Sequence, residues 1–385
     1  MISIITVFVA AVFAVTIFIV NDLSDQPAQT TLGSIYLGSY EPSQYQSVVT
    51  SEVNQFLNQA TYEIKYQNEI YELPISYFTF LRDQTLNTIS ENKNNTLIFG
   101  ITEPNLIQFM SDLEAAFSND VVELIDIQTL NTKIVSDLGQ MITKKEYHLE
   151  LYFEEIALDH ELNIEVIEDN ALVNHIDQIT NEVQVIEIAP KAQFSLLDAI
   201  GDLELNNEQL SIVANGMLKV LLKSHMNGFT FETNPTPQMW SPEGFNIRIL
   251  KINGYDFTFY NGHNYMYKIE IEKLSDTALT FKLLGLPYVN TYDYIIETKT
   301  TVPFRTLYVY DETIDENTIG VMITETDTQT IYHLLDTPGI DGKIIDIIRV
   351  STSNKGIITQ TKLYDMLYPD IPSIYKENII EKDGA

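Results

Sequence analysis

The pattern of hydrophobic and polar positions begins with one long apolar run and continues as short periodic segments. Met1–Val20 has no charged residue, and its only polar side chains are Ser3, Thr6 and Thr16. Twenty helical residues rise about 30 Å, the thickness of a bilayer's hydrocarbon core. A cleaved signal peptide would need a shorter apolar region, a basic start and a small-x-small cleavage site. The run therefore predicts an uncleaved transmembrane helix over residues 1–20.

The next part of the chain mixes helical and strand patterns. Residues 21–31 are polar and aperiodic, which predicts a tether. Apolar residues at helical spacing predict helices over Ser43–Ala60 and Pro104–Phe117. Tyr62–Pro74 alternates in the manner of two strands around a turn at residues 67–69. We expect an α+β domain over residues 32–188.

The following part begins with a helix and continues as strands. A stripe of apolar residues predicts a helix over Asn207–Lys223. Phe245–Ile252 and Tyr255–Tyr260 flank Asn253-Gly254, a strong hairpin signal. We expect a mainly antiparallel β domain over residues 189–375 and a polar tail over residues 376–385. The predicted fold class is thus α+β, with a transmembrane helix, an α+β domain, and a helix followed by antiparallel strands. Further strands are predicted at Tyr265–Ile271, Leu279–Leu284, Thr306–Tyr310 and Ile344–Val350.

The net charge and the absence of cysteine exclude several classes of protein function. Lys plus Arg number 22 and Asp plus Glu number 54, so the formal net charge is −32. This charge repels phosphate backbones, which excludes nucleic acid as a partner on electrostatic grounds. The absence of Cys excludes disulfides, thiolate nucleophiles and cysteine-ligated metal centres.

Motifs that would carry enzyme chemistry are absent from the sequence. Asp336–Gly339 (DTPG) matches one GTPase motif, but no phosphate-binding loop accompanies it, so a turn is the better interpretation. The six histidines form no i, i+4 pair, and no Gly-x-Ser-x-Gly elbow occurs. We therefore predict no catalytic residue, no cofactor and no metal site. The remaining candidates are interpreted as solvated acids or core packing: Asp311-Glu312 with Asp315-Glu316, Glu154-Glu155, Glu270 with Glu272, and Trp240.

Short motifs in a fixed order suggest a family. Gly33–Gly38 (GSIYLG), Pro190–Ser195 (PKAQFS), Leu210–Leu222 and Asp256–Asn261 (DFTFYN) are the clearest of them. Together they resemble the VanW-like family of Gram-positive cell-envelope proteins, including the peptidoglycan-binding domain that precedes the VanW region in membrane-anchored members. The weaker matches are Ile200-Gly201, Gly244–Ile247, Leu284-Gly285, Pro338-Gly339 with Arg349, and Tyr368-Pro369.

This chain departs from the family where a catalytic site would lie. VanW regions typically carry Gly-Gly-Gly-Ile-Cys-Gln at the start of the helix, with an Arg and a His downstream. A Cys at a helix N-terminus with a later His is an arrangement that activates a thiolate. Here Ser211 falls at or beside the Cys position, Phe231 replaces the Arg, and no His occurs in Asn234–Gln238. A Ser without a base is not an activated nucleophile, so we predict that the chain is not an enzyme.

The resemblance implies a non-enzymatic, membrane-anchored cell-envelope protein that binds peptidoglycan or another envelope component. Its expected location is the cell membrane, with a single pass and an extracytoplasmic soluble part. Two alternatives stay open. One is a cell-wall enzyme that uses Ser211 or paired carboxylates, and the other is a structural or assembly subunit that binds only protein partners.

Overall fold

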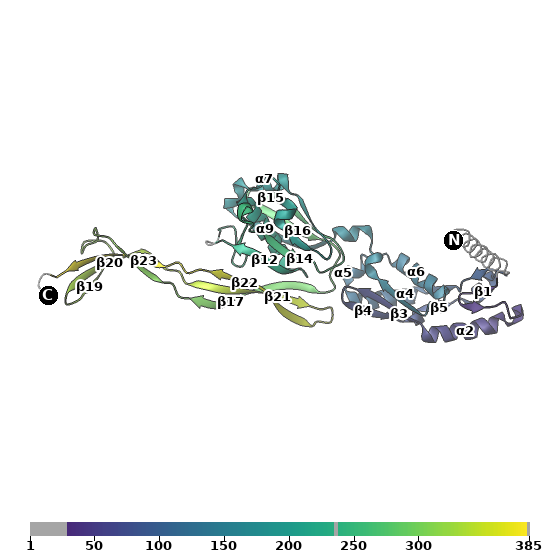
Figure 1. The fold of residues 1–385 in the computed structure, drawn as a ribbon. Helices are drawn as coiled ribbons and strands as arrows, with labels where there is room; N and C mark the ends of the chain where they lie inside the picture. Colours follow the sequence, from purple (N-terminus) through teal and green to yellow (C-terminus); the bar gives the residue numbers. More distant parts are fainter. Residues whose placement is uncertain (1–28, 235–237, 383–385) are drawn as a thin grey trace, which may run out of the picture. The chain divides into compact units, whose positions relative to one another are not determined.

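The computed structural model describes residues 29–234 and 238–382 (Figure 1). The chain divides into two compact units, Met1–Glu154 and Glu155–Ala385. The fold mixes helices with many antiparallel sheets. The sequence-based boundary between residues 188 and 189 lies inside the second unit.

The prediction of a single-pass membrane protein requires correction. Across residues 29–234 and 238–382, no helix is long and apolar enough to span a membrane. The longest helix there has 16 residues and rises about 24 Å, which is less than the hydrocarbon core of a bilayer. The predicted segment at residues 1–20 lies outside the described residues. The transmembrane part of the fold class and the membrane location are therefore not supported.

The first unit has the elements that its periodicity predicts. Helix α2 (Tyr45–Gln59) precedes strands β3 (Thr61–Tyr66) and β4 (Glu69–Leu73), which form the expected hairpin. Helices α4 (Glu103–Phe117) and α6 (Ile127–Gly139) bury one apolar face each. The other elements include β1 (Thr31–Leu32), β2 (Ile35–Tyr36), β5 (Phe78–Phe80), α3 (Arg82–Thr88), β6 (Asn94–Asn95), β7 (Phe99–Ile101), α5 (Asn119–Val122) and β8 (Lys144–His148).

The second unit is built around an antiparallel sheet of order β10-β15-β16-β9. The strands β9 (Glu161–Glu168) and β10 (Val185–Ile188) precede residue 189, whereas β15 (Tyr267–Ser275) and β16 (Ala278–Leu284) follow it. Residues on both sides of the sequence-based boundary therefore share one sheet. Helix α7 (Ile176–Glu182) packs against β15.

A second sheet in this unit has the order β11-β14-β12-β13. Its strands are β11 (Gln193–Ser195), β12 (Asn227–Thr233), β13 (Ile247–Arg248) and β14 (Phe257–Tyr260), and the short helix α8 (Leu196–Ile200) follows β11. The predicted hairpin around Asn253-Gly254 is wrong as a ladder, because only one isolated bridge, Leu250 to Tyr255, joins its two arms. Strand β14 pairs with β11 and β12 instead. The turn itself is present, with Gly254 in the left-handed region at φ 68°.

Helix α9 (Asn207–Leu222) is the central element of the second unit. It packs against β9 and β16 of one sheet and β13 of the other (Figure 1). Burial extends around the whole helix, because sheet residues meet it from two sides, and 13 of its 16 residues are buried. Gly216 lets the helix approach β16, since a Cβ there would lie 2.2 Å from the ring of Phe281.

The last strands form two further sheets. Strands β17 (Thr291–Val302), β21 (Gly342–Thr352) and β22 (Ile358–Tyr368) form one, in the order β17-β21-β22. The other has the order β18-β23-β20-β19, from β18 (Thr306–Tyr310), β19 (Met322–Glu325), β20 (Gln329–Thr337) and β23 (Ser373–Glu381). Residues 376–381, expected in a polar tail, belong to β23, whose backbone pairs with β18 and β20.

Candidate functional site

A cleft of about 260 Å³ opens at the start of helix α9. Three segments of the second unit contribute to its walls: the first turns of α9, the chain around Trp240, and β13 with the residues after it. Most of the lining side chains can form hydrogen bonds. The lining residues are Asn207, Glu208, Ser211, Asn234, Gln238, Trp240, Arg248, Ile249 and Leu250.

The start of α9 is held by reciprocal capping bonds. The side chain of Asn206 accepts a hydrogen bond from the backbone N–H of Gln209, and the Gln209 side chain accepts one from the backbone N–H of Asn206. Asn207 Oδ1 accepts a hydrogen bond from the backbone N–H of Lys251 at 3.1 Å. These bonds satisfy backbone donors at the helix start and fix the wall of the cleft.

The hydroxyl of Ser211 is occupied by backbone groups. It donates to the carbonyl oxygen of Asn207 at 2.7 Å and accepts from the backbone N–H of Ile249 at 2.9 Å. The side chain is 5% exposed. The hydroxyl proton is thus committed to a carbonyl, which is the structural role that the sequence favours for this residue.

Asn215, one turn further along the helix, also forms hydrogen bonds with the backbone of β13. Its Nδ2 donates to the carbonyl oxygens of Ser211 and Ile247, at 2.6 Å and 3.2 Å. Its Oδ1 accepts from the backbone N–H of Ile247 at 3.2 Å and from Ser241 Oγ at 3.3 Å. Because α9 lies at the edge of β13, these two polar side chains satisfy backbone groups of β13 that no further strand reaches.

Arg248 is a cation in the wall of this cleft. Its guanidinium carbon lies 5.9 Å from the centre of the Tyr255 ring. Glu232 stands opposite Arg248 in the β12–β13 ladder, yet no ion pair of Arg248 exists among the described residues. No motif in the sequence marks Arg248, which is a single Arg between two isoleucines.

One histidine lies near the start of α9, because His175 Nε2 is 3.7 Å from Glu208 Oε2. The two histidines that follow the helix in sequence, His225 and His263, lie far from Ser211. His225 follows the end of α9, and the 11 residue-to-residue steps from Ser211 to Leu222 alone rise about 17 Å. The rings of His225 and His263 stack with centroids 3.5 Å apart and planes 4° apart. His225 Nε2 bonds Asn261 Oδ1, and His263 Nδ1 bonds the Tyr267 hydroxyl at 2.7 Å. The structure therefore brings His225 and His263 to each other and away from Ser211.

Burial keeps this histidine pair uncharged. It lowers the pKa of His225 to about 2, with a further contribution from the neighbouring His263. It also lowers the pKa of His263 to about 4. The two neutral, stacked rings contribute to packing inside the unit. The spacing of His225 and His263 in the sequence does not predict that they stack.

The other sequence candidates are structural. Phe231 packs against the rings of Phe257 and Tyr364, and Trp240 belongs to the core while it lines the cleft. The four acids at 311–316 lie in the loop between β18 and β19, where Asp311 and Asp315 accept bonds from nearby backbone and Thr groups.

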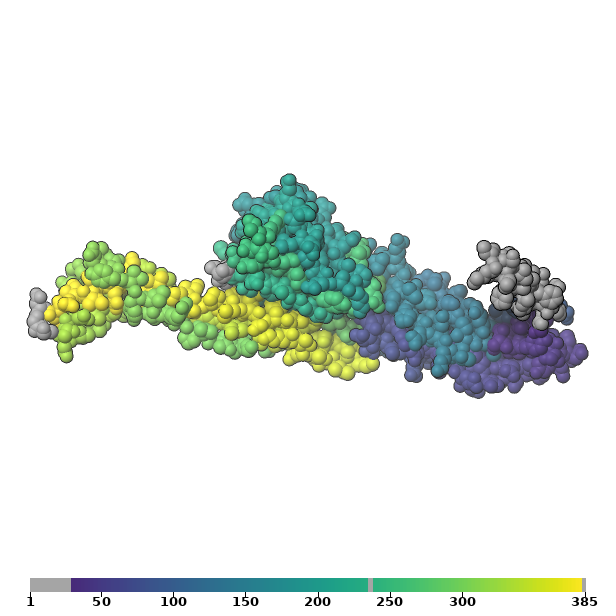
Figure 2. Space-filling model, in the orientation of Figure 1, coloured from purple at the N-terminus to yellow at the C-terminus, as the bar shows by residue number. Residues whose placement is uncertain are grey.

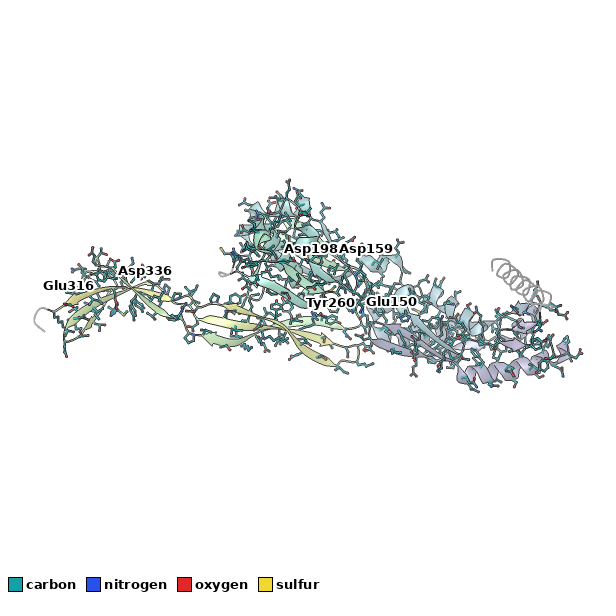
Figure 3. All side chains as sticks on the ribbon, in the orientation of Figure 1. Glu150, Asp159, Asp198, Tyr260, Glu316 and Asp336 are labelled. Carbon is teal, nitrogen blue, oxygen red and sulfur yellow. The ribbon has the colours of Figure 1, made fainter. Side chains whose placement is uncertain are left out.

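The remaining acids lie on strands or in connecting segments. Glu272 pairs with Lys282 at 2.6 Å. Asp336 and Thr337 end β20, and Pro338-Gly339 follow as irregular backbone, so the predicted DTPG turn is not formed as such. Figure 3 shows Asp336 in the same sheet region as Glu316. In the described ranges, no group of three or more His, Cys, Asp or Glu could hold a metal ion.

Comparison with known proteins gives no family assignment. No protein-family model matches the chain, and no curated protein matches it. Among solved structures, the IgA1 protease G5 domain structure is similar at 18% sequence identity and a TM-score of 0.15. That similarity covers 23% of this chain and 88% of that one.

Proposed function

We propose that this chain is a non-enzymatic protein that binds peptidoglycan or another component of the cell envelope at the α9 cleft. The observation that carries the proposal is the lining of the cleft. Hydrogen-bonding side chains and Arg248 surround an open space, while the Ser211 hydroxyl is held by backbone groups. Such a lining suits recognition of a polar ligand, and it lacks an activated nucleophile.

The resemblance to VanW-like proteins supports the choice of ligand. Peptidoglycan presents amides, hydroxyls and carboxylates, and these groups match the Asn, Gln and Arg side chains of the cleft. Trp240 supplies an apolar floor, because it is 4% exposed and fixed in the core. The net charge of −32 does not oppose binding of a glycan chain, which is held by hydrogen bonds.

The enzymatic alternative lacks support at this cleft. A serine nucleophile must give its proton to a base, but the Ser211 hydroxyl donates to the carbonyl oxygen of Asn207. His225 and His263 lie beyond the other end of α9, and His175 contacts Glu208, with no hydrogen bond to Ser211 among the described residues. Glu208 is the carboxylate among the lining residues, so the cleft does not hold the pair of acids that glycoside hydrolysis uses.

Co-sedimentation with purified cell-wall sacculi tests the proposal. We expect the full chain to pellet with sacculi and Arg248→Gln to pellet several-fold less, because Arg248 is the cation among the described residues that line the cleft. Arg305→Gln is the matched control, since Arg305 is exposed and pairs with Asp370 in the segments before β18 and after β22, and it does not line the cleft. Failure of the full chain to pellet would reject the proposal. Release of soluble muropeptides during the incubation would support the enzyme instead.

One observation favours a second candidate, assembly with a protein partner. All five residues of β18 and all four of β19 are exposed, and they include Leu307, Tyr308 and Ile323. Figure 2 shows the surface over these strands in light green. A chain with this net charge repels its own copies, so the expected partner has a basic surface. If a Leu307→Ser/Ile323→Ser variant binds sacculi as well as the wild-type protein does, these exposed strands are not needed for envelope binding, and the two functions are separate.

A further inference from the structure

Arg248 is a basic residue without an ion pair among the described residues, in a chain with a large excess of acids. Acidic residues outnumber basic ones by 54 to 22, so a basic side chain has many acids available for pairing. Several lysines of the second unit do pair within 3 Å, for example Lys268 with Asp159 and Lys343 with Glu243. Arg248 has no such ion pair within the described residues, although Glu232 stands opposite it in the ladder. Arg248 is thus a lining residue of the cleft whose charge is not paired with an acid of the described residues.

The side chain of Arg248 is also held in place. It is half-buried in the wall of the cleft, and the Tyr255 ring lies 5.9 Å from its guanidinium carbon. The strand that carries it is fixed on both sides of position 248, because Asn215 bonds Ile247 and Ser211 bonds Ile249. A planar guanidinium in a fixed position binds a carboxylate through two parallel hydrogen bonds.

The surroundings of Arg248 limit the charge of the ligand. Glu208 lines the same cleft, and Glu232 lies across the ladder. Two carboxylates near one guanidinium repel a polyanion such as a phosphate polymer. The two carboxylates repel a ligand with a single carboxylate less than they repel a polyanion, because that ligand brings only one negative charge to the guanidinium.

We propose that the α9 cleft recognises a peptide through one free carboxylate, which Arg248 binds. This inference rests on the proposed function and specifies its ligand class as the peptide part of the envelope polymer. The amide side chains of Asn207 and Asn234 lie around the same space, where they can bond the amides of a peptide backbone.

Calorimetric titration of the full chain with two synthetic stem peptides tests this inference. One peptide ends in a free carboxylate and the other, otherwise identical, ends in a carboxamide. We expect the carboxylate form to bind about 10- to 100-fold more tightly, the range for a charge-assisted pair. This comparison uses the unmodified protein, so it does not depend on the folding of a variant.

Variants then assign the effect to Arg248. Arg248→Gln should remove the preference for the carboxylate, and Arg305→Gln should keep it. Glu232→Gln should strengthen binding of the carboxylate peptide several-fold, because it removes a competing negative charge. Retention of the full preference in Arg248→Gln would overturn the assignment.

The two proposals fail in different ways. If sacculi bind but the two peptides bind equally or not at all, the inferred ligand class is wrong and the proposed function stands. If sacculi do not bind while the carboxylate peptide still binds more tightly, the proposed function falls and the carboxylate site stands. If neither sacculi nor peptides bind, both are rejected.

Discussion

Two regions of the second unit contain similar strand sequences and bury them to very different extents. Strand β16 (ALTFKLL), which packs against α9, buries six of its seven residues, whereas β18 (TLYVY) exposes all five. Figure 1 shows the β18-β23-β20-β19 sheet as a narrow ribbon without a helix on it. The comparison teaches that burial depends on the second layer that covers a sheet and not on the apolar content of the strand.

The strongest test of this comparison is Gly216→Ala, which introduces a methyl group between α9 and β16. Its Cβ would lie 2.2 Å from the Phe281 ring, so the two layers must separate. We expect the free energy of unfolding of the second unit to fall by about 3 kcal/mol. Urea denaturation followed by circular dichroism measures this loss.

The matched control for this substitution is Gly262→Ala. A Cβ at Gly262 would have its nearest neighbour at 3.9 Å, an ordinary contact. We expect a change of about 0.5 kcal/mol or less there. Equal losses for the two variants would show that α9 is not tightly packed on the sheet.

Acidification should weaken the α9 region through the histidine pair. Burial lowers the pKa of His225 to about 2 and that of His263 to about 4, both below the ordinary value of about 6.5. The unfolded chain therefore binds more protons, and stability that is present above pH 6.5 falls as the pH drops toward 4. Thermal unfolding midpoints between pH 7 and pH 4 measure the slope.

Carboxylates also titrate in this range, so the slope must be assigned to the histidines by substitution. His225→Gln/His263→Gln should be less stable at pH 7 and should show a shallower decline. His148→Gln, which changes an exposed histidine of the first unit, should keep the full slope. An unchanged slope in the double variant would refute the assignment.

Ser211→Ala should have a smaller effect, confined to stability. The substitution leaves the backbone N–H of Ile249 without its acceptor, at a cost of about 1–2 kcal/mol. Ligand binding should persist, and a fluorophosphonate probe should not label the wild-type protein at Ser211. Stoichiometric labelling that disappears in the alanine variant would instead identify a catalytic serine.

The smallest effect is expected on the exposed sheet. Val309→Thr on β18 changes a side chain that is 50% exposed and keeps the branched shape that strands favour. The free energy of unfolding should change by about 0.5 kcal/mol or less. A loss above about 2 kcal/mol would mean that this sheet is covered in solution, which chemical denaturation can detect.

Periodic segments were the part of the fold that the sequence predicted well. The helices around Phe56 and Leu113, and the helix from Asn207, all lie where apolar spacing placed them. The Asn253-Gly254 hairpin failed because pairing is decided by partners far along the chain, here β11 and β12. Local turn chemistry made the turn and could not specify the ladder.

The candidate site was less accessible to sequence reasoning. Ser211 was singled out, but its bond to the N–H of Ile249 depends on the approach of β13 to α9. Arg248 and the His225–His263 stack arise from contacts between segments distant in sequence. Residues of these types occur in any chain, so only the tertiary structure shows which of them meet.

The position of β23 between β18 and β20 has a consequence for biosynthesis. Strand β18 is translated about sixty residues before β23, its pairing partner in the sheet. At about 5–20 residues per second, its edge stays unpaired on the ribosome for about 3–12 s. During that interval the nascent chain exposes β18 and the β19–β20 hairpin as open edges. Slow codons between residues 311 and 372 would lengthen this window and raise the chance of misassembly between neighbouring nascent chains.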